Sequence, residues 1–165
     1  MKKLNIFALL STLFLLLPAF VSCDKDDPTA ADAILGTYSG TLGYSVMGFD
    51  PGTIEGTYDL KILKDADDED DVVVVIPECT FAPPIPNARP FTIPSLTVDD
   101  VDVTASGNVY TFKEDSFSLT IDGKIYEGSN LIGTVNGKKV TLRYQLKPAT
   151  MPMDILFSFD GNVKE

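Results

Sequence analysis

The stretch GTVNGKKVTLRYQL, residues 133–146, carries the strongest fold signal in the chain. Asn136-Gly137 separates two runs of alternating residues, and this dipeptide favours the type I′ turn whose twist matches that of paired strands. After the turn, polar residues alternate with apolar ones, which are Val140, Leu142, Tyr144 and Leu146. A period of two is typical of a strand with one buried face, so the stretch predicts an antiparallel hairpin.

The same pattern extends outward from this hairpin in both directions. Asp122-Gly123 predicts a second hairpin, and Phe112 and Phe117 fall on different faces of one run, so we expect a bulge within 113–116. Further alternating runs begin near residues 36, 57, 95 and 155, whereas the run at 71–81 is apolar on both faces and requires a cover or a partner there. No convincing amphipathic helix follows the amino terminus. About eight strands at regular spacing predict an all-β fold, an antiparallel barrel or sandwich.

The amino terminus has the parts of a secretory signal peptide. A cationic start at Met1-Lys2-Lys3 precedes an uncharged apolar run over 6–21, which is short for a membrane span and contains Pro18. The sequence FVSC that ends this region resembles the lipobox of bacterial lipoproteins. That resemblance implies cleavage after residue 22 and attachment of acyl chains to Cys23. Several acyl chains make membrane anchoring stable, which one chain does not.

These features predict three segments: a lipoprotein signal peptide at 1–22, an acidic tether at 23–33 and a β-barrel domain at 34–165. The sequence DKDD, which follows Cys23, resembles the surface-export signal of some Gram-negative lipoproteins. The alternative is a solvated tether that its charges keep extended. We expect a lipid-anchored protein of the outer membrane, exposed at the cell surface.

Composition excludes several classes of function. The chain has no histidine, which rules out Ser-His-Asp and Cys-His catalysis and histidine-ligated zinc. Its net charge of −11 opposes binding to nucleic acid. If Cys23 is lipidated, Cys79 has no disulfide partner, and a buried structural thiol is the expected state. We therefore expect a protein that is not an enzyme and needs no cofactor.

Four stretches together resemble the calycin-like domain of bacterial lipoproteins: GTYSGTL, DVDVTASGNVYTF, GTVNGKKVTLRYQL and MPMDILFSFDG. The resemblance covers about residues 34–163 in order. It implies a meandering, lipocalin-like barrel of about eight strands. That family has no established activity, so the resemblance assigns no functional residue.

Two unusual segments each have two interpretations. The sequence KDADDEDD at 64–71 holds six carboxylates, which suits calcium, but Asp70 and Ile76 replace the glycine and glutamate of an EF-hand loop. A solvated turn between strands is the alternative. The proline-rich segment 82–94 is either a stiff lid or docking segment, or a rigid crossing loop.

A hollow barrel would line its interior with aromatic rings, and an eight-stranded barrel can be filled or hold one small ligand. The candidate ligand-lining residues are Tyr38, Tyr44, Tyr58, Tyr110, Phe112 and Tyr144. The expected occupant is a small apolar or glycan ligand. The alternative is a solid-core assembly protein whose outer surface meets another envelope protein.

Overall fold

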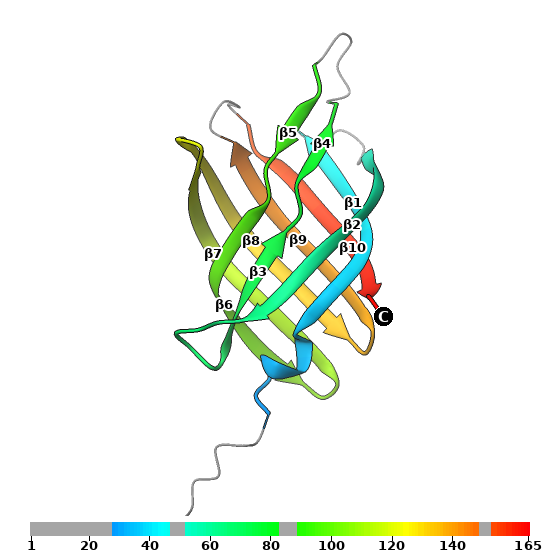
Figure 1. Ribbon diagram of the computed structural model, residues 1–165, viewed down its shortest axis with the longest axis vertical. Helices are drawn as coiled ribbons and strands as arrows, with labels where there is room; N and C mark the ends of the chain where they lie inside the picture. The colour runs from blue at the N-terminus through cyan, green and yellow to red at the C-terminus, as the bar shows by residue number, and fades with distance from the viewer. Residues whose placement is uncertain (1–27, 47–51, 83–88, 149–152) are drawn as a thin grey trace, which may run out of the picture.

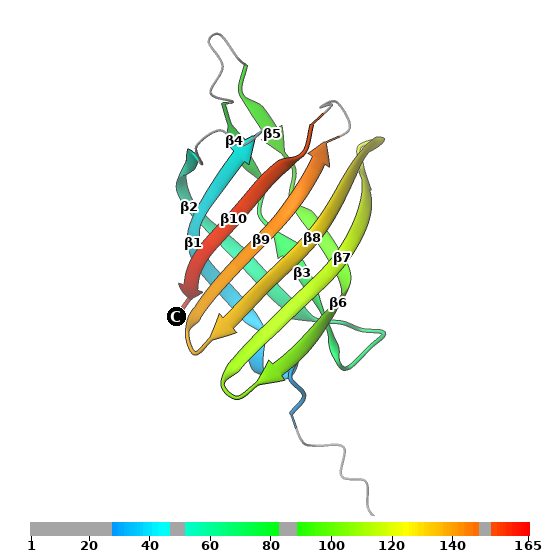
Figure 2. The ribbon, with the colours of Figure 1, turned by 180° about the vertical axis from the view of Figure 1, so that it is seen from behind.

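Eight long strands close into an antiparallel barrel in the computed structural model, which describes residues 28–46, 52–82, 89–148 and 153–165 (Figures 1 and 2). The order around the barrel is β1-β10-β9-β8-β7-β6-β3-β2. In chain order these strands are β1 (Gly36–Val46), β2 (Gly52–Lys64), β3 (Asp71–Ile76), β6 (Leu96–Ser106), β7 (Val109–Ile121), β8 (Lys124–Asn136), β9 (Lys139–Pro148) and β10 (Ile155–Val163). The prediction of an antiparallel, eight-stranded barrel is confirmed.

A separate two-stranded ribbon lies between β3 and β6. Its strands are β4 (Cys79–Phe81) and β5 (Phe91–Ile93), and we call it the arm. The apolar run 71–81 therefore forms two strands rather than one, broken at Pro77, which has no N–H for a ladder. In Figure 1 the arm extends past one end of the barrel, and the described chain begins at the opposite end, where Asp32–Ile34 forms the 3₁₀ helix η1. Residues 83–88 of the proline-rich segment lie outside the described residues.

The barrel core follows the alternation of the strands. Val140, Leu142, Tyr144 and Leu146 of β9 are all buried, whereas Arg143 between them is exposed. In β3 the even-numbered valines are fully buried and the odd-numbered ones half-buried, so its outer face is only partly covered. Burial of these inward apolar side chains is the main force that holds the barrel closed.

Glycines let rings and backbone approach the strands closely, and Gly40 and Gly133 are two examples. A Cβ on Gly40 of β1 would lie 2.1 Å from the carbonyl oxygen of Asp160, so the backbone of β10 approaches β1 closely at this glycine. A Cβ on Gly133 of β8 would lie 2.0 Å from the ring of Phe112, whose side chain occupies that space.

The expected bulge at 113–116 of β7 is wrong in its position. Glu114 pairs with Leu131 and Ser116 with Ser129, so β7 keeps one register against β8. The register shift lies between β8 and β9, at Ser129/Ile132, where Asn130 has a φ of 52°. Asparagine tolerates this left-handed conformation better than most residues, which fits a bulge at this point.

Turn chemistry was predicted correctly at one hairpin and wrongly at the other. Asp122 and Gly123 both have positive φ, as a type I′ turn requires. At the second hairpin Asn136 pairs with Lys139, so Gly137 and Lys138 form the turn, and only Gly137 has positive φ. The turn is therefore centred one residue later than expected and is not of type I′.

Candidate functional site

Three aromatic side chains on neighbouring strands form a row inside the barrel near the arm. The register pairs Phe157 of β10 with Tyr44 of β1 on one side and with Tyr144 of β9 on the other. The rings of Tyr144 and Phe157 are stacked, with centroids 5.1 Å apart and an interplanar angle of 15°. Phe81 of the arm packs on this aromatic row, 4.6 Å from Tyr44 and 5.8 Å from Phe157 between centroids. Tyr44 also donates an exposed hydrogen bond of 2.8 Å to the carbonyl of Ala82, the residue after β4, which ties the arm to β1.

The hydroxyl of Tyr144 is buried without a hydrogen-bond partner among the described residues. The side chain is 1% exposed, and burial raises the pKa of Tyr144 well above its usual value. Cys79 of the arm is also buried, and burial raises the pKa of its thiol to about 11. Both groups are neutral at physiological pH, so this region favours an uncharged molecule over an ion.

The six predicted lining residues do not form one site. Tyr44 and Tyr144 share the aromatic row, and Phe112 packs over Gly133 in a different row. Tyr38 is buried and donates a hydrogen bond of 2.8 Å to the Ile34 carbonyl.

The remaining two of the six are only half-buried. Tyr58 packs against Gly56 and donates to the Glu55 carbonyl at 2.9 Å, and Tyr110 lies opposite Val135. A role in lining a ligand therefore stays a prediction for all six. It is best supported for Tyr44 and Tyr144, because both belong to the aromatic row.

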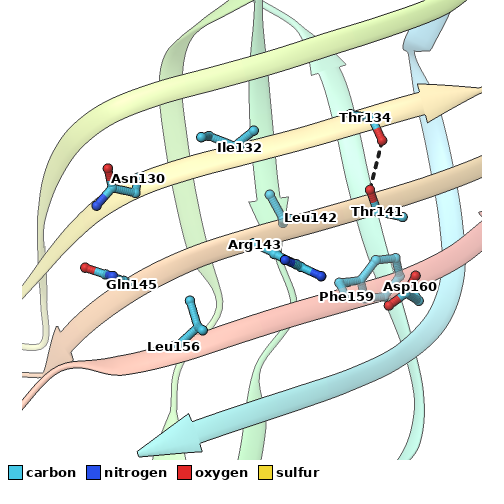
Figure 3. Close-up of a pocket in the computed structure, with 10 residues that line it drawn as sticks. All are labelled: Asn130, Ile132, Thr134, Thr141, Leu142, Arg143, Gln145, Leu156, Phe159 and Asp160. Carbon is cyan, nitrogen blue, oxygen red and sulfur yellow. Dashed lines mark hydrogen bonds between the residues drawn. The ribbon is translucent and has the colours of Figure 1, made fainter. Parts of the chain in front are cut away.

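A groove of about 450 Å³ lies on the outer face of β8, β9 and β10 (Figure 3). Its lining residues are Asn130, Ile132, Thr134, Thr141, Leu142, Arg143, Gln145, Leu156, Phe159 and Asp160. Arg143 lies at its centre, opposite Ile132 on β8 and Ser158 on β10. The groove is thus built around one guanidinium group, with aliphatic and polar side chains on both sides.

The acidic turn lies between β2 and β3, as expected. Asp65 and Asp68 each accept a hydrogen bond from a backbone amide two residues along, at 2.8 and 2.9 Å. The hydrogen bond to Asp65 is the main reason that the pKa of its carboxyl lies below the usual value. Within the described residues, no cluster of three or more acidic or cysteine side chains is arranged to hold a metal ion. The described part of the chain also contains no helix that is long and apolar enough to cross a membrane.

Comparison with protein families agrees with the closed barrel. The model of the calycin-like β-barrel domain matches residues 34–162. The chain belongs to this family. The calycin-like fold is typically a binding fold, and the barrel with its aromatic row is consistent with that general role.

Among solved structures, this calycin-like chain is similar to a protein of Bacteroides fragilis that is provisionally named an outer membrane protein. The TM-score is 0.66 and the identity 22%, over 81% of this chain and 52% of the other, so the calycin-like chain spans about half of that protein. At this identity the likeness concerns the fold. No functionally curated protein matches the chain.

Several residues of these two sites were not predicted from the sequence. Phe157 and Phe81 complete the aromatic cluster. Phe157 lies on β10, the strand that follows β9, whereas Phe81 is distant from Tyr144 along the chain. At the outer groove, Ile132 and Leu156 are 50% and 44% exposed. The sequence did contain a signal for these two residues, because each is a large apolar residue at an outward-facing position of an alternating strand.

Proposed function

We propose that this calycin-like protein is a lipid-anchored, non-catalytic protein of the cell envelope that binds one small, mainly apolar molecule inside its barrel. The observation that carries the proposal is the buried hydroxyl of Tyr144 without a described partner. A buried polar group normally has a hydrogen-bond partner, and a missing partner requires an explanation. A ligand with one oxygen or nitrogen acceptor would supply it, while the aromatic row holds the apolar part.

The arm gives this proposal a route of entry. Phe81 of the arm packs on the aromatic row, and this end of the barrel lies opposite the end where the described chain begins. Acyl chains on Cys23 would therefore hold the arm end away from the membrane, toward incoming ligand. The likeness to a protein provisionally named an outer membrane protein supports an envelope location.

Native mass spectrometry tests ligand binding. Residues 24–165 of the wild type, exposed to an envelope extract, are expected to retain a small-molecule mass that the Tyr144→Phe variant loses. Tyr38→Phe is the matched control, because its hydroxyl is buried but already bonded to Ile34. Bare monomer masses for wild type and both variants would contradict the ligand. A co-purified protein in place of a small molecule would support the solid-core assembly function instead.

Anchoring has a separate test. Cys23→Ala is expected to leave an unprocessed or soluble product that does not partition with membranes. Normal processing and membrane retention of that variant would overturn the lipoprotein assignment without affecting ligand binding.

A further inference from the structure

The outer groove is open because the residues beside its central arginine, on the neighbouring strands β10 and β1, are small. Arg143 lies opposite Ser158, and Ser158 lies opposite Gly43 on β1. A Cβ on Gly43 would lie 2.6 Å from the hydroxyl oxygen of Ser158, so the serine side chain leans toward β1. The larger side chains of Leu156 and Asp160 stand on either side of Ser158 along β10 (Figure 3). The surface in front of the guanidinium is therefore left open.

Arg143 differs from the lysines near it in having no acidic partner among the described residues. Lys139 and Lys147, at the two ends of β9, lie 3.9 and 3.6 Å from Asp160 and Glu127, respectively. Arg143 forms no ion pair or hydrogen bond within the described part of the chain, although the whole protein carries a net charge of −11. A guanidinium group presents a fixed fork of N–H donors that matches a carboxylate. Because the Arg143 guanidinium has no described acidic partner, we expect the groove to bind an anionic group.

The other groups in the groove suit a hydroxyl-rich molecule. Thr134 and Thr141 hold their hydroxyls 2.8 Å apart, and Gln145 adds an amide on the same face. Asp160 can accept hydrogen bonds from hydroxyls, but its charge opposes a doubly charged phosphate. On either side, Ile132 and Leu156 offer exposed aliphatic surface on which the C–H face of a sugar ring can rest.

A peptide strand fits this surface poorly. Peptides that extend a sheet pair with free backbone groups at an edge strand. Here β9 is bonded to β8 and β10 along its length, and the barrel is closed. A ligand in the groove can therefore be recognised only by side chains. This favours a ligand with many hydroxyl groups, which can form hydrogen bonds with those side chains.

We propose that the groove over β8–β10 binds an acidic saccharide, with a sugar carboxylate on Arg143 and ring hydroxyls on Thr134, Thr141 and Asp160. This site is on the outside of the barrel, so it is independent of the interior ligand proposed above. Together with the surface anchoring proposed above, on which this role rests, the site makes the protein a receptor for uronic-acid sugars.

Isothermal titration calorimetry of the purified full-length protein in detergent tests the proposal. The ligands are trisaccharides of galacturonate, glucuronate and mannuronate, each compared with its methyl ester. We expect at least one acid to bind, its ester to bind about tenfold more weakly or worse, and added salt to weaken binding. Arg143→Gln should lose about tenfold or more in affinity, and Arg143→Lys should recover only part of it.

Controls separate this site from general charge and from the barrel interior. Lys124→Gln removes an exposed cation at the start of β8, away from the groove, and should leave affinity unchanged. Tyr144→Phe should also leave it unchanged. The proposal is overturned if no acid binds, if acid and ester bind equally, or if Arg143→Gln binds like the wild type. Equal affinity for propionate would overturn the saccharide and leave only an anion site.

Discussion

Replacing Tyr144 with phenylalanine should stabilise the ligand-free protein, although it deletes a polar group from the core. The hydroxyl makes no hydrogen bond to any described residue, so its removal breaks none of them. The ring, stacked 5.1 Å from Phe157, stays in place. A buried polar group without a partner costs about 1–3 kcal/mol. Allowing for the small void that remains, we expect the free energy of unfolding to rise by about 1–2 kcal/mol.

Urea and thermal unfolding of the ligand-free barrel measure this effect, which corresponds to an increase in Tm of about 3–8 °C. Tyr38→Phe is the matched comparison, since its hydroxyl donates to the Ile34 carbonyl at 2.8 Å. That variant should lose about 1 kcal/mol, because a buried carbonyl is left without its donor. If Tyr144→Phe destabilises the protein as much as Tyr38→Phe does, the Tyr144 hydroxyl has a partner in solution and the reasoning fails. With saturating ligand the wild type should become more stable than Tyr144→Phe, because only the tyrosine hydroxyl can form a hydrogen bond to the ligand.

Three further predictions concern packing, reactivity and pH. Gly40→Ala should cost about 1–3 kcal/mol in urea unfolding, since its Cβ would meet the Asp160 carbonyl oxygen at 2.1 Å; an unchanged midpoint would contradict this close approach. Cys79, with a pKa of about 11, should react with iodoacetamide at pH 8 only after denaturation, and rapid labelling of the native protein would show an open arm. The hydrogen bond from Lys164 lowers the pKa of Asp59 below 3.8, so this carboxylate stabilises the fold above that pH and the contribution is lost as pH falls through its folded pKa. Asp59→Asn should therefore flatten the dependence of Tm on pH in that acidic range, and a parallel curve would refute the pairing.

Local chemistry made most of the barrel predictable. Asp122-Gly123 sets its own turn through positive φ at both residues. Alternation then assigns the inward and outward faces along all of β9, and along β7 and β8 on each side of the point where their buried positions change parity. The break of the apolar run at Pro77 follows from the missing N–H of proline, and the sequence contained that signal as well. The second hairpin was predicted wrongly. The Asn136-Gly137 dipeptide indicated a turn at those two residues, but Asn136 pairs with Lys139, so the turn consists of Gly137 and Lys138.

The sites were harder to predict because they depend on the register between strands, including the pairing of β1 with β10 from opposite ends of the chain. Alternation places Tyr44 and Tyr144 inside the barrel, but it does not show that Phe157 joins them in one row. That row depends on the register of β1, β10 and β9. The bulge at Asn130 of β8 shifts the register of β8 against β9 by an amount that no local pattern specifies. Similarly, nothing near Arg143 in sequence reveals that Ser158 and Gly43 leave the space in front of it open.

One strand serves both proposed sites, and its geometry should keep them separate. Tyr144 points into the barrel, whereas Arg143, its neighbour in β9, points outward. The closed sheet lies between the two side chains, and they share no described hydrogen bond or ion pair. Effects of changes add when the two groups share no partner and neither change moves the backbone between them. The double variant Tyr144→Phe, Arg143→Gln should therefore lose the interior ligand and the acidic saccharide by the same factors as the single variants. A larger or smaller combined loss would mean that β9 shifts when one site is filled, and the two sites would then be coupled through that strand.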